Sequence, residues 1–214
     1  MTAWLLRLFG ILLMLSAIAL ALSRAPDRAV ETLVARWALP PSSFIDLDGQ
    51  LVHLRDVGPR DDPLPIVLLH GTSSSLHTWQ GWVQGLERQR RVVTLDLPGF
   101  GLTGPRSDGQ YHPDADARFV LALLDRLGIA RAVLGGNSLG GEVAWRLATL
   151  APERVERLIL VDSAGLPVGE RALPLGWMLA RVPVLNRIAE WALPRALVAD
   201  GVAKAYGGPE QVTA

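Results

Sequence analysis

Residues 131–152, RAVLGGNSLGGEVAWRLATLAP, place a serine between two pairs of glycines, where one sequence pattern changes into another. The apolar run before Ser138 is typical of a strand that is buried on both faces. After Ser138, apolar side chains recur at helical spacing until Pro152. The stretch therefore predicts a strand over 131–137, a sharp turn at Ser138 and a helix over 138–152.

The same alternation of strand and helix extends on both sides of this stretch. A turn at Asp48-Gly49 predicts a hairpin of two short strands within 43–57, and Gly128 predicts the end of a helix. The other predicted strands are 65–70, 91–97 and 157–162, and the other predicted helices are 76–89 and 114–128. Alternating strands and helices indicate an α/β fold with a mostly parallel sheet of about six strands and helices on both faces.

Composition excludes several classes of function. The chain has 214 residues, a formal net charge of zero and no cysteine. A neutral chain without a basic surface does not suggest nucleic-acid binding. The lack of cysteine excludes disulfides, thiolate catalysis and cysteine metal sites. We expect no metal and no cofactor.

The N-terminus carries an apolar segment, WLLRLFGILLMLSAIALAL, over residues 4–22 with Arg7 as its one charge. Nineteen helical residues nearly span a bilayer core. We expect residues 1–24 to anchor the chain in a membrane, specifically a bacterial inner membrane, followed by a linker over 25–42. A signal segment cleaved near Ala19-Leu20-Ala21, with export of the rest, and a buried helix of a soluble protein are the alternatives.

A serine at a strand-to-helix turn has a chemical use. A sharp turn exposes the hydroxyl of Ser138 above the sheet, and glycines at 136 and 140 leave room for the turn to close. The helix that begins there directs its N–H groups at developing negative charge. The pattern favours Ser138 as a nucleophile.

Three further motifs carry a family resemblance. They are LLHGTSSSLHTW (68–79), LDLPGFGLTG (95–104) and LILVDSAG (158–165). Together with GNSLGG, they make the chain resemble the serine-dependent branch of the α/β-hydrolase superfamily. The resemblance implies an α/β-hydrolase core over 43–165 and a partial helical cap over 166–214. It also implies an oxyanion hole made by the backbone N–H groups of Thr72 and Leu139, with His70, Gly71 and Asn137 supporting the loop and the turn.

The resemblance implies hydrolysis of a small apolar carbonyl substrate of the ester type, through an acyl-enzyme on Ser138. Asn137-Ser138 is also similar to the pair in carbon–carbon bond hydrolases of diketone-type compounds. The family places an acid and then a histidine after the serine, and no histidine follows Ser138. We expect both to lie beyond residue 214 and the 214 residues alone to be nearly inactive. The alternative is a membrane-tethered, non-catalytic binding module.

The remaining polar residues receive structural interpretations. We expect His53 to be exposed on its strand, His77 to lie at the lip of the site and His112 to lie in a loop. We expect Asp96 to hydrogen-bond turn backbone and Ser73, Ser74 and Ser75 to form a loop and a helix cap. Glu142 is interpreted as a helix-face residue or an ion-pair partner, and Asp162 occupies a less common position for the family's acid.

Overall fold

A computed structural model describes residues 2–22, 28–166, 182, 199–200 and 203. The chain divides into two compact units, Arg28–Pro167 and a second unit made of Met1–Asp27 with Val168–Ala214. The cap predicted for 166–214 lies almost entirely outside the described residues.

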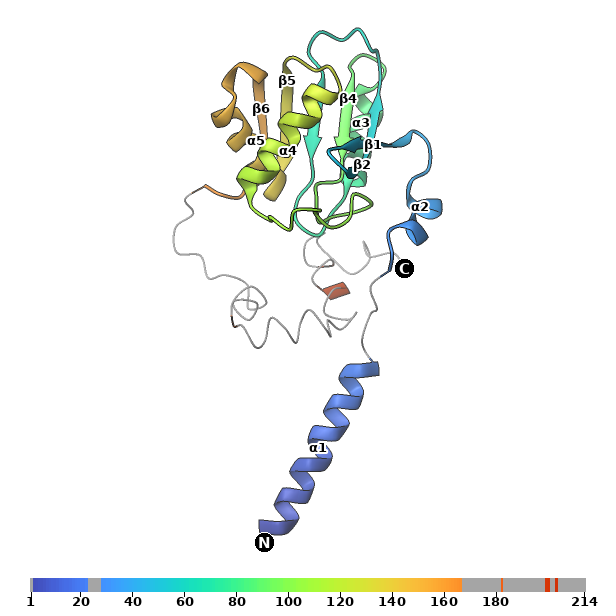
Figure 1. Ribbon diagram of the computed structural model, residues 1–214, viewed down its shortest axis with the longest axis vertical. Helices are drawn as coiled ribbons and strands as arrows, with labels where there is room; N and C mark the ends of the chain where they lie inside the picture. The colour runs from blue at the N-terminus through green and yellow to red at the C-terminus, as the bar shows by residue number, and fades with distance from the viewer. Residues whose placement is uncertain (1, 23–27, 167–181, 183–198, 201–202, 204–214) are drawn as a thin grey trace. The chain divides into compact units, whose positions relative to one another are not determined.

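Within Arg28–Pro167, strands and helices alternate as the sequence predicts (Figure 1). The first half holds α2 (Glu31–Trp37), β1 (Ser42–Leu47), β2 (Gln50–Val57), β3 (Ile66–Leu69), the 3-10 helix η1 (Leu76–Trp79), α3 (Gln80–Leu86) and β4 (Val92–Leu95). The second half holds α4 (Pro113–Arg126), β5 (Ala132–Asn137), α5 (Leu139–Leu150), the 3-10 helix η2 (Pro152–Arg154) and β6 (Val155–Val161).

The six strands form one sheet in the order β1-β2-β4-β3-β5-β6. β1 pairs antiparallel with β2, and β2 pairs antiparallel with β4. The pairs β3–β4, β3–β5 and β5–β6 are all parallel. The predicted α/β fold with a mostly parallel six-strand sheet is therefore confirmed.

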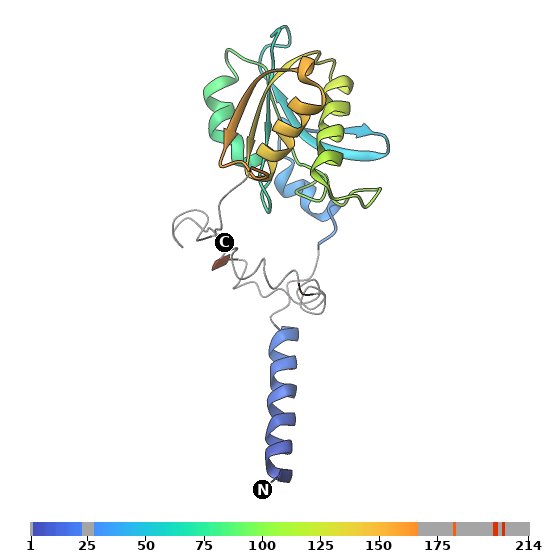
Figure 2. The ribbon, with the colours of Figure 1, turned by 90° about the vertical axis from the view of Figure 1, so that its left-hand side faces the viewer.

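Helices cover both faces of the sheet, with α3 on one face and α4 on the other (Figure 2). The alternation of side chains along β3 shows why its sequence is apolar throughout. Val67 and Leu69 pack toward α4 and α5, whereas Ile66 and Leu68 pack toward η1 and α3. Every residue of β3 and β4 is buried as a result.

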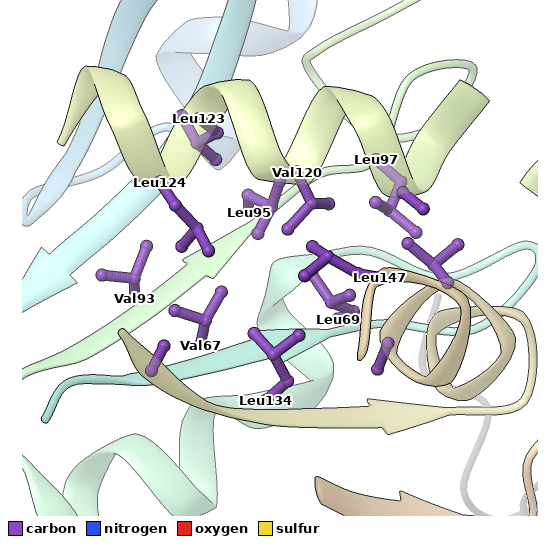
Figure 3. Close-up of a cluster of buried hydrophobic side chains, with 14 of the residues drawn as sticks. Val67, Leu69, Val93, Leu95, Leu97, Val120, Leu123, Leu124, Leu134 and Leu147 are labelled. Atoms are coloured by element: carbon purple, nitrogen blue, oxygen red, sulfur yellow. The ribbon is translucent and has the colours of Figure 1, made fainter. Parts of the chain in front are cut away.

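The larger core fills the space between the sheet and the pair α4 and α5 (Figure 3). Leu123 and Leu124 of α4 and Leu147 of α5 are fully buried against the strands. Full burial of a side chain of this size contributes roughly 1.5–3 kcal/mol. This packing fixes α5, and therefore the turn that precedes it, against the carboxyl end of β5.

Local signals end the elements where the sequence predicts. Asp48 and Gly49 both have positive φ, 53° and 83°, as a tight hairpin turn requires. Gly128 adopts φ 65° directly after α4, and its N–H donates to the carbonyl of Asp125. These left-handed conformations suit glycine because it has no Cβ.

The other unit has one described helix of substantial length, α1 (Thr2–Leu22). Its segment Ala3–Leu22 has the length and composition of a membrane span, and none of it is buried. An N-terminal signal sequence has the same properties.

Candidate active site

Ser138 occupies the turn between β5 and α5 in a conformation that few side chains adopt. Its φ is 50° and its ψ is −115°. Its N–H donates to the carbonyl of Val161 at 3.1 Å, and its carbonyl accepts from the N–H groups of Glu142 at 3.1 Å and Ala164 at 2.9 Å. A backbone held in such a region costs on the order of 1–3 kcal/mol and persists only where its surroundings enforce it. Here the end of β6 and the first turn of α5 provide that enforcement.

The glycines on either side of Ser138 are required by close approach of backbone to backbone. A Cβ on Gly136 would overlap the backbone of Gly140, and a Cβ on Gly140 would overlap the backbone of Leu69 at the end of β3. A Cβ on Gly141 would lie 2.8 Å from that of Ser163. Only glycine therefore allows the turn to close against two neighbouring strands.

The loop after β3 comes directly alongside this turn. A Cβ placed on Gly71 would lie 3.2 Å from the Cβ of Ser138 and 2.8 Å from Oδ1 of Asn137. Thr72, next in the chain, is exposed, and Leu139 is the half-buried first residue of α5. The fold thus brings both segments that carry the predicted oxyanion-hole donors next to Ser138.

His70 is fully buried at the start of that loop, and both of its ring nitrogens are engaged. Nε2 accepts a hydrogen bond from the N–H of Leu97 at 3.0 Å, which leaves Nδ1 to donate to the carbonyl of Gly71 at 2.8 Å. Burial lowers the pKa of His70, against the opposing effects of the Gly71 carbonyl and Asp96. A neutral imidazole with no free nitrogen supports the loop and is not available as a base.

His53 is not exposed, contrary to the expectation from the sequence. It has no exposed surface, and its Nδ1 lies 2.7 Å from Oδ2 of Asp96. The prediction failed because other side chains cover the face of β2 that carries His53: the ring of Phe44 on β1 stacks on it at 5.1 Å, and the ring of His77 lies 6.3 Å away. Phe44 across the hairpin and Asp96 after β4 thus decide the surroundings of His53.

Asp96 accepts hydrogen bonds from loop backbone, as predicted, but its two backbone donors come from two different loops. Its Oδ1 accepts from the N–H of Leu76 at 2.7 Å and its Oδ2 from that of Leu102 at 2.8 Å. Burial opposes ionisation of this carboxyl, but the hydrogen bonds from His53, Leu76 and Leu102 outweigh it and lower the pKa of Asp96. The group is a buried carboxylate at neutral pH.

The predicted serine cap of η1 does not form. Ser75 stands at the N-cap position of η1, but its side chain makes no capping hydrogen bond and its Oγ instead lies 3.2 Å from Nδ1 of His77. The N–H of Leu76, the first residue of η1, donates to Asp96. A partner twenty residues away is invisible to a local sequence pattern.

His77 is half-buried and lines a cavity of about 290 Å³. The lining residues are Leu33, Trp37, Ser75, His77, Asp96, Gly101 and Leu102. Nε2 of His77 lies 3.2 Å from Nη2 of Arg55. Burial and then the charge of Arg55 lower the pKa of His77. The ring is therefore neutral at physiological pH.

The other polar residues have structural positions. His112 is the N-cap of α4, where Nδ1 accepts from the N–H of Asp114 at 3.2 Å, a role that the local sequence did not predict. Glu142 forms an ion pair with Arg146 one turn along α5, as predicted. Asp162 is exposed just past β6, with φ 45°. Within the described residues, no group of three or more His, Cys, Asp or Glu side chains suits a metal ion.

Comparison with known proteins adds the family. Residues 65–193 match the model of the alpha/beta hydrolase fold family. The chain is 32% identical over 162 residues to 2-hydroxy-6-oxo-2,4-heptadienoate hydrolase of Pseudomonas putida, covering 73% of this chain and 58% of that protein. It is 37% identical over 97 residues to an esterase of Mycobacterium tuberculosis, covering 45% of this chain and 32% of that protein.

Among solved structures, a bacterial membrane phospholipase A is similar, with a TM-score of 0.59 and 27% identity over 80% of this chain and 55% of that one. The chain thus spans between a third and three fifths of the length of these relatives. The family match covers more than half of the 214 residues and agrees with the sheet order and the helices on both faces. The chain therefore belongs to the alpha/beta hydrolase fold family.

Proposed function

We propose that the protein is a serine hydrolase that acts on an ester-type carbonyl substrate, with Ser138 as the nucleophile. The observation that carries the proposal is the backbone of Ser138, held at φ 50° at the end of β5 with the Gly71 loop against it. A serine in this position presents its hydroxyl to a carbonyl that is bound above the sheet. No structural requirement of the turn explains a serine there, since glycine or asparagine adopts positive φ more easily.

The proposed reaction has two steps. Oγ of Ser138 attacks the carbonyl carbon, a base takes the hydroxyl proton, and the negative oxygen is bound by the N–H groups of Thr72 and Leu139. The intermediate expels the alcohol, which takes up that proton, and leaves an acyl-enzyme. Water then repeats the attack and releases the acid. The N-terminus of α5 adds its dipole to the stabilisation of the oxyanion.

The base is the group that the described residues do not supply. Both nitrogens of His70 are occupied, and Nδ1 and Nε2 of His77 face Ser75 and Arg55. His53 is buried against Asp96, and His112 caps α4. We therefore propose that the base that activates Ser138 comes from outside the described residues.

A second candidate reaction is hydrolysis of a carbon–carbon bond in a diketone-type compound. Its support is the similarity to the heptadienoate hydrolase over 73% of this chain and the Asn137-Ser138 pair. Nδ2 of Asn137 donates to the carbonyl of Val161 at 3.1 Å, so this side chain is held beside the nucleophile. A panel of p-nitrophenyl esters and a meta-cleavage diketone, tested on the full-length protein, distinguishes the two reactions.

We propose that the substrate is small and apolar, and that α1 holds the enzyme at a membrane. The length and apolar composition of Ala3–Leu22 support an anchor, and cleavage as a signal sequence remains the alternative. The site of attachment would be a bacterial inner membrane. Sequencing the mature N-terminus from membranes tests this, because a start at Leu22 or Arg24 would refute a retained anchor.

The nucleophile is tested with a fluorophosphonate probe, which labels a serine only when a base activates it. We expect the full-length protein to be labelled and Ser138→Ala to lose labelling and esterase activity, by up to ~10⁶-fold by analogy with another serine hydrolase. Efficient labelling of residues 1–214 alone would show that the base lies within them. A full-length protein that neither labels nor hydrolyses would favour the non-catalytic binding module.

A further inference from the structure

Asp96 joins three segments that meet at the carboxyl ends of the central strands. Its side chain accepts hydrogen bonds from Leu76, where the loop after β3 ends, and from Leu102 in the loop after β4. The third partner is Nδ1 of His53 on β2. A Cβ on Gly101 would overlap the Asp96 carboxylate, so the loop after β4 wraps closely around this side chain.

Both ends of the loop over 70–76 form a hydrogen bond to the segment that follows β4. At its start, Nε2 of His70 accepts from the N–H of Leu97, and at its end the N–H of Leu76 donates to Asp96. The two hydrogen bonds are reciprocal, because the loop after β3 and the loop after β4 each contribute one side-chain acceptor and one backbone N–H. Thr72 and Ser73 lie between them, and Ser73 is held at φ 59°. A strained loop of this length keeps one conformation only while both ends are fixed.

We propose that Asp96 is a positioning residue that holds the loop over 70–76 so that the N–H of Thr72 points at the oxyanion. His53 assists by fixing the orientation of the Asp96 carboxylate. The inference rests on the proposed function, since an oxyanion hole has a use only if Ser138 attacks a carbonyl. Because a shift of about 1 Å in a catalytic group can cost ~10²-fold in rate, we expect Asp96→Asn to lower kcat by about 100-fold with little change in KM.

Asp62 provides a matched control at the opposite end of the same strands. Its carboxylate accepts from the N–H groups of Leu64 at 2.9 Å and Arg91 at 2.8 Å and pairs with Arg90. It therefore resembles Asp96 in having two backbone donors and one side-chain partner, but it lies where β3 and β4 begin. Asp62→Asn should lower stability and leave kcat unchanged.

The experiment measures both variants in the full-length protein with p-nitrophenyl butyrate and a fluorophosphonate probe. Hydrogen exchange of the backbone amides is measured in parallel. In Asp96→Asn we expect roughly tenfold faster exchange at Leu76, as for the loss of one hydrogen bond to a charged group, and a fall in labelling rate that matches the fall in kcat. Asp62→Asn should change exchange only near Leu64 and Arg91.

His53→Asn and His53→Phe provide a second pair if Asp96→Asn does not fold. The asparagine amide can donate to Asp96 where the imidazole does, whereas phenylalanine cannot, so His53→Asn should retain more of kcat than His53→Phe at equal stability. Equal activity of Asp96→Asn and Asp62→Asn, or equal activity of the two His53 variants, would overturn the inference. A wild type without Ser138-dependent activity would instead refute the proposed function.

Discussion

Asp116 makes the stability of the core depend on pH in a direction opposite to that of most carboxylates. Its side chain is 8% exposed on α4, and its Oδ1 accepts from Nη1 of Arg106 at 2.9 Å. Burial raises the pKa of Asp116 from 3.8 to about 6, although the charge and hydrogen bond of Arg106 oppose this. A carboxyl whose pKa is raised by folding stabilises the folded state below its unfolded pKa, and this contribution is lost as the pH rises through about 6.

The magnitude follows from the size of the shift. About two pKa units correspond to roughly 3 kcal/mol between the protonated and ionised forms at 25 °C. We therefore expect wild type to lose up to roughly 3 kcal/mol from this group between pH 4 and pH 7. Asp116→Asn removes the titration, so the free energy of unfolding of the variant relative to wild type should rise by about that amount over the same interval. Arg106 keeps its ion pair with Asp108 in the variant.

The assay is urea unfolding in detergent at half-unit steps between pH 4 and pH 7.5, followed by tryptophan fluorescence. Asp114→Asn serves as the control. Asp114 lies on the same helix, and its hydrogen bond with Arg146 lowers the pKa of Asp114. This control should not produce a rise in relative stability between pH 4 and pH 7. A flat difference between Asp116→Asn and wild type across this range would refute the reasoning.

Three further predictions test packing, the loop and the membrane segment. Gly140→Ala should destabilise the protein by about 1–3 kcal/mol, because the added Cβ would overlap the backbone of Leu69. Gly81→Ala in α3, where the added Cβ meets open space, should stabilise the protein by about 0.4–1 kcal/mol. Equal melting temperatures for the two variants would contradict this expectation. His70→Ala should cost about 1–3 kcal/mol of stability because it leaves the buried N–H of Leu97 without its acceptor, as measured by urea unfolding. Deletion of residues 1–24 should move the protein from the membrane pellet to the supernatant after alkaline extraction, and a deletion variant that stays in the pellet would refute the anchor.

The regular elements could be predicted from the sequence because their signals are local. Runs of apolar residues that are buried on both faces predicted β3, β4 and β5, and helical periodicity predicted α4 and α5. The turn at Asp48-Gly49 and the end of α4 at Gly128 follow from the freedom of glycine at positive φ. Ser138 could be selected as the candidate nucleophile for the same reason, since the strand, the glycines and the helix adjoin it in the chain.

The support of the candidate site could not be predicted, because it depends on contacts between segments that are distant in the sequence. His53 looked exposed on an alternating strand, but the ring of Phe44 covers it and its Nδ1 contacts Asp96, 43 residues away. Ser75 looked like a helix cap, but its side chain makes no capping hydrogen bond, and the first N–H of η1 donates to Asp96. Local sequence by itself determined the strands, the helices and the serine turn. Only the tertiary structure decided which buried polar groups meet, because a hydrogen-bond partner that sheet packing brings close leaves no periodic signal in the chain.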